Sequence, residues 1–170
     1  MGTNQRASIV MTEDEIADFV VKSRTGTMAT IGRDGQPHLT AMWYAVVDGE
    51  IWIETKAKSQ KAVNLRRDPR VTFLIEDGDT YDTLRGVSFE GVAEIVDDPE
   101  VSHRVGVSVW ERYTGPYTDD MKPFVEQMMN KRVCVRIVAN RSRSWDHRKL
   151  GMPAMPVGGS TAPAVSGTGQ

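Results

Sequence analysis

Several features that mark other protein classes are missing or scarce in this chain of 170 residues. It has one cysteine, Cys134, so no disulfide can form within the chain and a reducing, cytoplasmic setting is expected. No apolar run approaches the roughly 20 residues that cross a bilayer, so we expect no membrane association. The net charge is −2, which lacks the basic excess of a dedicated nucleic-acid-binding protein.

Metal and hydrolase motifs are absent as well. The three histidines, His38, His103 and His147, do not stand at paired ligand spacing, so no metal site is expected. The segment GVSFE at 86–90 approaches the GxSxG nucleophile pattern, but it ends in glutamate and no helix is expected after it. Apolar residues make up 39% of the chain and charged residues 26%, which is typical of one ordinary globular domain.

Turn and cap signals divide the chain into short strands and helices. Two Asp-Gly pairs, at 34–35 and 48–49, predict tight hairpins, and Thr12 with Glu15 forms a capping box. The expected strands are 27–31, 39–47, 51–55, 71–75, 86–96 and 133–138, and the expected helices are 12–23, 59–67, 98–113 and 122–130. This pattern predicts a mainly β protein with short helices (α+β), a six-stranded antiparallel barrel that is closed or half closed.

Three regions follow from composition. Residues 1–11 carry no clear pattern and are taken as an N-terminal extension, and residues 12–150 form the expected barrel domain. Residues 151–170 consist mostly of Gly, Pro, Ser, Thr and Ala, which cannot bury a core. We therefore expect a flexible C-terminal tail.

The strongest chemical signal is the segment TKAKSQK at 55–61, called here the lysine turn. A strand is expected to end there and a helix capped by Ser59 to begin. The first amides of a helix are unpaired donors at the positive end of its dipole, and such an end binds phosphate. The segment predicts a phosphate site, although a solvated lysine-rich loop before a capped helix has the same pattern.

Residues 28–75 together resemble the pyridoxamine-phosphate oxidase-like superfamily, through TMATIGRDGQPHLTAMWYAVVDGEIWIET and KSQKAVNLRRDPRVTFLIED. The resemblance implies an FMN-binding-protein-like split β-barrel that forms homodimers, with each cofactor groove lined by both chains. It implies that the cofactor is held by Thr40, Met42, Trp43, Ile53, Thr55, Lys56, Lys58, Ser59, Lys61 and, more weakly, Asn64. Of these, 55, 56, 58, 59 and 61 would hold its phosphate, and 40, 42, 43 and 53 would lie along its rings.

Two segments point to one branch of this superfamily. MWYAVVDGEIWIET and SRSWDHRKL are similar to the branch that uses the deazaflavin coenzyme F-420, whose tail carries a phosphate and carboxylates. The basic segment 141–149 is then expected to meet that tail through Trp145, Arg148 and Lys149, although nucleic-acid binding or a solvated charge run would also fit it. True pyridoxamine-phosphate oxidases carry arginine where this chain has Gln60, so vitamin B6 oxidation is not expected.

The sequence thus predicts an oxidoreductase that transfers hydride from reduced coenzyme F-420 to a small conjugated or quinone-like acceptor. No side chain stands out as a catalytic acid or base. Two alternatives remain open, namely an FMN-dependent oxidoreductase of the same fold and a non-catalytic flavin- or haem-binding protein.

Overall fold

A computed structural model describes residues 5–159 of the chain. Residues 1–4 of the expected extension (1–11) and residues 160–170 of the expected tail (151–170) lie outside the described residues. The described elements, in chain order, are α1 (Gln5–Ser8), α2 (Glu13–Lys22), β1 (Gly26–Ile31), β2 (Pro37–Met42), β3 (Ala45–Val47), β4 (Glu50–Lys56), α3 (Gln60–Arg67), β5 (Arg70–Asp77), β6 (Arg85–Val96), α4 (Pro99–Tyr113), η1 (Asp119–Met121), α5 (Lys122–Met129), β7 (Arg132–Asp146) and η2 (His147–Leu150).

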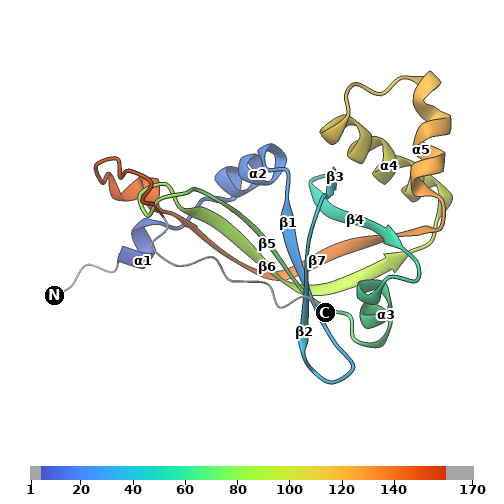
Figure 1. The fold of residues 1–170 in the computed structure, drawn as a ribbon, viewed down its shortest axis with the longest axis horizontal. Coiled ribbons are helices and arrows are strands. Elements are labelled where there is room, and N and C mark those ends of the chain that lie inside the picture. Colours follow the sequence, from blue (N-terminus) through green and yellow to red (C-terminus); the bar gives the residue numbers. More distant parts are fainter. Residues whose placement is uncertain (1–4, 160–170) are drawn as a thin grey trace.

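The strands form one antiparallel sheet in the order β2-β1-β5-β6-β7-β4-β3 (Figure 1). The predicted split-barrel architecture is therefore confirmed, but the predicted strand count of six is wrong, because the sheet has seven strands. The single strand expected at 39–47 is divided into β2 and β3. The division occurs at Tyr44, whose backbone N–H donates to the hydroxyl of Tyr113 at 2.9 Å.

Closure of the barrel follows from this division. β2 and β3 stand at opposite edges of the sheet, yet only Trp43 and Tyr44 separate them in the sequence. A link of two residues cannot cross a flat seven-stranded sheet, so the sheet must curl until its two edges meet. The link Trp43–Tyr44 is called the seam below.

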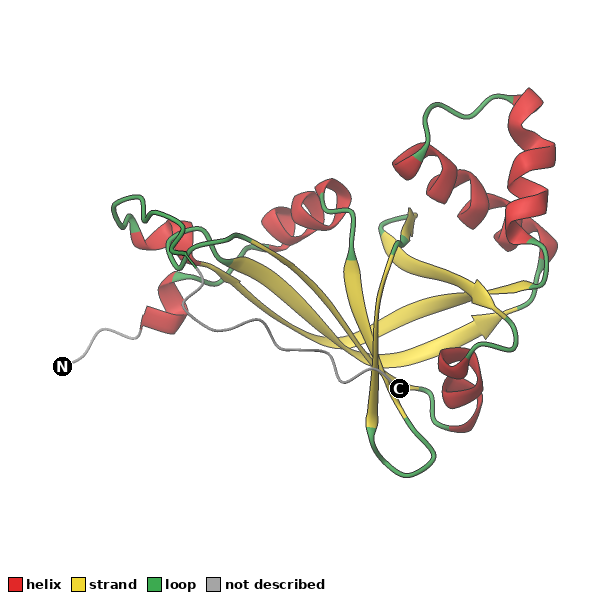
Figure 2. Ribbon diagram, viewed as in Figure 1, coloured by secondary structure: helices red, strands yellow, loops and turns green. Residues whose placement is uncertain are grey.

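Two apolar clusters stabilise the molecule, one on each side of β4. Inward side chains of the curled sheet form the first cluster with Phe19 and Val20 of α2. The second lies between β3, β4 and β7 and the pair α4 and α5, and it includes Trp52, Val109 and Cys134. Figure 2 shows these two helices gathered at one end of the sheet.

The helix caps agree with the sequence. Thr12 and Glu15 form the predicted capping box at the start of α2, and Ser59 accepts a hydrogen bond from the amide of Ala62 at the start of α3. Ahead of α2, the carbonyl of Ile9 accepts from the amide of Asp146 at 2.7 Å. Among the described residues, no helix is long and apolar enough to cross a membrane.

β7 is longer than the strand expected at 133–138. Its first half pairs with both β4 and β6, and its second half, up to Asp146, pairs with β6 alone. A β-bulge interrupts this second pairing between Glu90 and Gly91. Such a bulge increases the local twist, and here it accompanies the change from a strand with two neighbours to one with a single neighbour.

Gly91 allows the close approach of two strands at this bulge. A Cβ atom on Gly91 would lie 2.0 Å from the carbonyl oxygen of Val138, and backbone cannot move aside as a flexible side chain can. We expect Gly91→Ala to lower the free energy of unfolding by about 2 kcal/mol, measured by urea denaturation. Gly158→Ala is the control, because no atom lies within 4 Å of the added Cβ. Equal stability of the two variants would contradict this interpretation.

Candidate functional site

The lysine turn joins the end of β4 to the start of α3, as predicted. The hydroxyls of Thr55 and Ser59 lie 3.1 Å apart, and Thr55 is only 4% exposed. The amide of Ala57 donates to the carbonyl of Lys131 at 3.0 Å, which fastens the turn to the residue before β7. The structure therefore brings the strand end, the hydroxyls and the first amides of α3 into one fixed corner.

Positive charge in this corner is not neutralised by the protein. Lys56 and Lys58 are exposed, Lys61 is half buried, and none of the three forms an ion pair within the described residues. The carboxylate of Glu54 is close enough to be influenced by the charge of Lys61, but its ion pair is with Arg132. Burial raises the pKa of Glu54, while the charges of Arg132 and Lys61 oppose that shift. The corner is thus a net cationic site at a helix N-terminus, which suits an anion.

Asn64 lies on α3 but is fully buried. Its amide group donates to the hydroxyl of Thr30 at 3.0 Å, and its carbonyl oxygen accepts from Gln60 at 2.8 Å. Asn64 thereby ties α3 to β1, because Thr30 is a β1 residue that is also fully buried. These contacts give the side chain a structural role, and only Gln60 of this group reaches the surface.

The four side chains predicted to lie along the cofactor rings occupy three different environments. Thr40 and Met42 share one face of β2, and Met42 packs against the barrel core. Trp43 is 57% exposed and stacks on Tyr113, with ring centroids 4.3 Å apart and an interplanar angle of 4°. Ile53 is fully buried in the barrel core. Within one chain these four side chains do not form a common surface.

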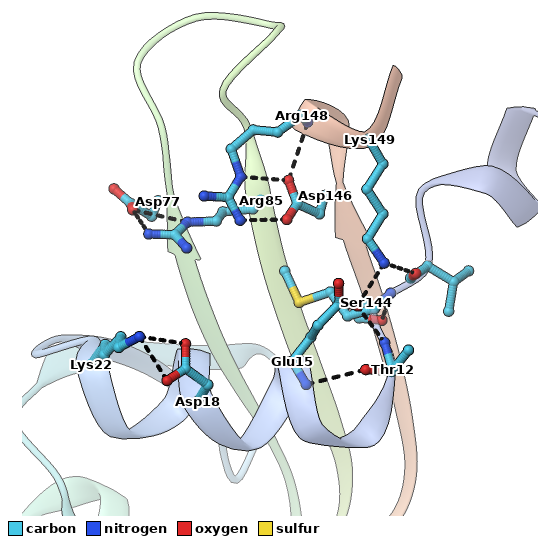
Figure 3. A network of polar contacts seen from close by, with 12 residues as sticks. Thr12, Glu15, Asp18, Lys22, Asp77, Arg85, Ser144, Asp146, Arg148 and Lys149 are labelled. Carbon is cyan, nitrogen blue, oxygen red and sulfur yellow. Dashed lines mark hydrogen bonds and ion pairs between the residues drawn. The ribbon is translucent and has the colours of Figure 1, made fainter. Parts of the chain in front are cut away.

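The basic segment 141–149 is part of β7 and η2, and its charges are paired. Arg148 binds Asp146 at 2.5 Å, and Lys149 binds Glu15 at 2.6 Å (Figure 3). Arg141 and Arg143 both contact Glu90. The carboxyl pKa of Asp146 is lowered chiefly by its hydrogen bond from Arg148.

This segment also lies at the opposite end of the sheet from α3 (Figure 1). Trp145 stands beside Gly86 of β6, where a Cβ atom would meet the indole ring at 2.4 Å. Within one chain, the structure therefore does not bring Trp145, Arg148 or Lys149 to the lysine turn.

No sequence pattern predicted the hydrogen bonds that hold the seam in place. Arg112 donates to the carbonyls of Tyr44 at 3.0 Å, Val21 at 3.0 Å and Ser23 at 2.7 Å. The hydroxyl of Tyr44 donates to the carbonyl of Val20 at 2.6 Å, and burial raises the pKa of this phenol to about 12. An Arg-Tyr pair at a helix end gives no sequence signal for such contacts, because their partners lie about 70 to 90 residues away.

No metal site is evident among the described residues. The described residues contain no group of three or more His, Cys, Asp or Glu side chains that could hold an ion. Cys134 is buried, and burial raises the pKa of its thiol to about 11, so it stays protonated near neutral pH.

Comparison with known proteins identifies the family. The chain is 84% identical to the conserved hypothetical protein Rv2991 from Mycobacterium tuberculosis, covering 94% of this chain and 100% of that one, with a TM-score of 0.90. An F420 reductase is 28% identical over 74% of this chain and 93% of its own, with a TM-score of 0.55. The haem storage protein HutZ from Vibrio cholerae shares the fold at 17% identity, covering 79% and 96%, with a TM-score of 0.62. Residues 12–146 match the family described as pyridoxamine 5′-phosphate oxidase. The chain therefore belongs to the pyridoxamine 5′-phosphate oxidase family of split-barrel proteins.

Proposed function

We propose that this protein is an oxidoreductase that uses reduced coenzyme F-420, with the lysine turn holding the coenzyme phosphate. The observation that carries the proposal is the unneutralised charge of Lys58 and Lys61 on either side of the Ser59 cap. A phosphate placed there would meet ammonium groups, free helix amides and a hydroxyl together. Lys56 and the hydroxyl of Thr55 lie at the same strand end.

The choice of F-420 over FMN has two supports. The first is the likeness to an F420 reductase, whose sequence identity of 28% exceeds the 17% of HutZ, whereas the TM-score of HutZ is the higher of the two. The second is charge, since the coenzyme carries a phosphate followed by carboxylates and gains more than FMN from a cationic corner. When bound, reduced coenzyme F-420 supplies a hydride for a conjugated or quinone-like acceptor, and the protein binds, orients and shields it from water.

Direct titration tests the cofactor. We expect coenzyme F-420 to bind more tightly than FMN at low salt, and the difference to narrow as salt is added, because screening weakens the more highly charged ligand more. Fluorescence titration of the purified protein with each cofactor measures both affinities. Tighter binding of FMN at every salt concentration would favour the FMN-dependent alternative. Binding of either cofactor or of haem, without turnover of any quinone-like acceptor, would favour a storage or carrier role.

The proposal includes a homodimer, because a large apolar side chain, Leu39, stands exposed beside a shallow hollow on the sheet. Leu39 on β2, Ala29 on β1 and Thr72 on β5 are neighbours across the strands. Leu39 is 63% exposed, and its two neighbours border a shallow hollow of about 410 Å³. A second copy is the occupant we propose, since it would cover this row and bring a second chain to each cofactor groove.

A single charge in this row should separate the subunits. We expect wild-type protein to sediment as a dimer at micromolar concentration and Leu39→Asp to sediment as a folded monomer, because an unpaired carboxylate is costly to bury. Phe124→Asp on α5 is the matched control. Phe124 is 57% exposed, but it lies on the helices of the second apolar cluster, where it stacks on Trp110. A wild-type monomer, or an unchanged dimer in the Leu39 variant, would contradict the proposed interface.

A further inference from the structure

A cavity of about 440 Å³ lies between α2 and the curled sheet, and it is called the α2 cavity below. It borders β4 where that strand begins, whereas the lysine turn follows the end of the same strand, so the two are separate sites. Its lining residues are Glu13, Ile16, Ala17, Val20, Val21, Val46, Gly49, Glu50, Ile51, Phe89, Ile137, Val138, Ala139 and Ser142.

The walls of the α2 cavity are mainly aliphatic. Ile51 and Ile137 belong to the apolar cluster of the barrel and Phe89 packs against it, so the floor of the cavity is part of the barrel core. The opposite wall consists of Ile16 and Val20 of α2 with their neighbours. Among the described residues Phe89 is the one aromatic side chain of the lining, so a planar ring would find no second ring to stack on. A flexible hydrocarbon chain suits such walls better.

Polar contacts at both ends hold α2 above the cavity. Near its start, Glu15 binds Lys149 at 2.6 Å (Figure 3). At its end, Arg112 donates to the carbonyl of the cap residue Ser23 at 2.7 Å. Between these ends Ala17 presents only a methyl group to the cavity. Because contacts outside the cavity fix the position of the helix, a ligand can fill the space without displacing α2.

The ionisable residues of the lining are all acidic within the described residues. Glu13 is exposed on α2 and forms no ion pair in the part of the chain that the structure describes. On β4, Glu50 lies 3.3 Å from Arg136, but the same guanidinium also binds Glu94 at 2.8 Å. One cation therefore faces two carboxylates, and the mouth of the cavity keeps a net negative charge. This charge repels the carboxylate of a fatty acid and attracts an ammonium group.

We propose that the α2 cavity binds one aliphatic chain that ends in an ammonium group, with the chain against the barrel core and the ammonium beside Glu13 and Glu50. Apolar walls with a few polar groups at the opening are typical of small-molecule sites, in which the polar groups fix the orientation of the ligand. The inference goes beyond the proposed function, because it involves neither the coenzyme phosphate nor the acceptor. It assigns a second ligand to the end of β4 that lies away from the lysine turn.

Three probes with the same hydrocarbon chain test the assignment: octylamine, 1-octanol and octanoate. Octylamine is protonated at neutral pH, as a lysine side chain is. Isothermal titration of the full chain below the micelle-forming concentrations should give the tightest binding for octylamine and the weakest for octanoate. Hexylamine should bind about 15-fold more weakly than octylamine, since each buried methylene contributes about fourfold. Binding should also shift the methyl resonances of Val20 and Ile137.

Two of these results would overturn the proposal. If octylamine does not bind, or binds without shifting those methyl resonances, the α2 cavity is not the site. If octanoate binds as tightly as octylamine, the assignment of an ammonium group is wrong.

A variant that fills the cavity provides an independent test. Ala17→Phe is expected to weaken octylamine at least about tenfold while the melting temperature and the affinity for coenzyme F-420 stay unchanged, because Ala17 is exposed and lies away from the lysine turn. Val63→Phe on α3 is the matched control, since it also enlarges an exposed helix residue but one outside the cavity. Unchanged octylamine binding by folded Ala17→Phe protein would overturn the site.

A charge variant tests the ammonium contact in case the bulky variant does not fold. Glu13→Gln should weaken octylamine about two- to fivefold and leave 1-octanol unchanged, because an exposed ion pair contributes modestly to binding. Glu111→Gln on α4 is the control, since Glu111 is an exposed carboxylate that does not line this cavity. Equal effects of Glu13→Gln on the amine and the alcohol would overturn the contact with Glu13.

Discussion

Replacement of Lys58 and Lys61 together by alanine is expected to reduce cofactor affinity at least about 100-fold. Each change removes a charge-assisted contact of about 1.5–3 kcal/mol, and every 1.4 kcal/mol corresponds to about a factor of ten. Neither lysine is held by a carboxylate in the described residues, so little internal structure is lost with them. Isothermal titration of the double variant and of both single variants with coenzyme F-420 gives the affinities.

Two control variants test whether the loss of affinity is specific to the lysines of the lysine turn. Lys122→Ala also removes a lysine, but one that lies on α5 in an exposed pair with Glu126, so we expect coenzyme affinity to change less than about threefold. Ser59→Ala should weaken binding modestly and destabilise α3, because Ser59 caps that helix. Full affinity in the double lysine variant would refute the phosphate site, while the fold and the family would be unaffected.

Arg112→Ala is expected to cause a large loss of stability, about 3 kcal/mol. The guanidinium donates to carbonyls of both α2 and the seam and lies 4.6 Å from the centroid of the Tyr44 ring. Its removal takes a charged donor from each of these carbonyls, which keep only contacts with Arg24 or with tyrosine hydroxyls, and it loosens the point where the sheet closes. For a domain of this size the loss corresponds to a melting temperature lower by roughly 6–12 °C.

Arg104→Ala on the same helix is the matched control. Arg104 contacts Asp48 in an exposed ion pair, which contributes little to stability. Arg112→Lys should recover part of the loss, because one ammonium cannot reach all the carbonyls that the planar guanidinium reaches. If Arg112→Ala melts at the same temperature as Arg104→Ala, the contacts at the seam are not a major source of stability.

Local sequence was sufficient for most elements. The capping box at Thr12, the Asp-Gly turns and the Ser59 cap each act within a few residues, so the helix starts and hairpins they predict agree with the structure. The same locality explains the error at 39–47. Its residues have strand preferences throughout, and only the hydroxyl of Tyr113, 69 positions away, takes the amide of Tyr44 out of the sheet.

The candidate site shows the same limit of what local sequence can predict. The sequence alone placed a strand end, a capped helix and three lysines within seven residues, because adjacent residues are necessarily close in space. Tertiary structure alone decided which charges are free. Arg148 and Lys149 looked as available as Lys58 from their spacing, yet both are paired. The partner of Arg148 is the nearby cap residue Asp146, whereas the partner of Lys149 is Glu15 of α2, 134 positions away. The pairing of Lys149 depends on which distant segment packs beside η2, and no local pattern specifies that contact.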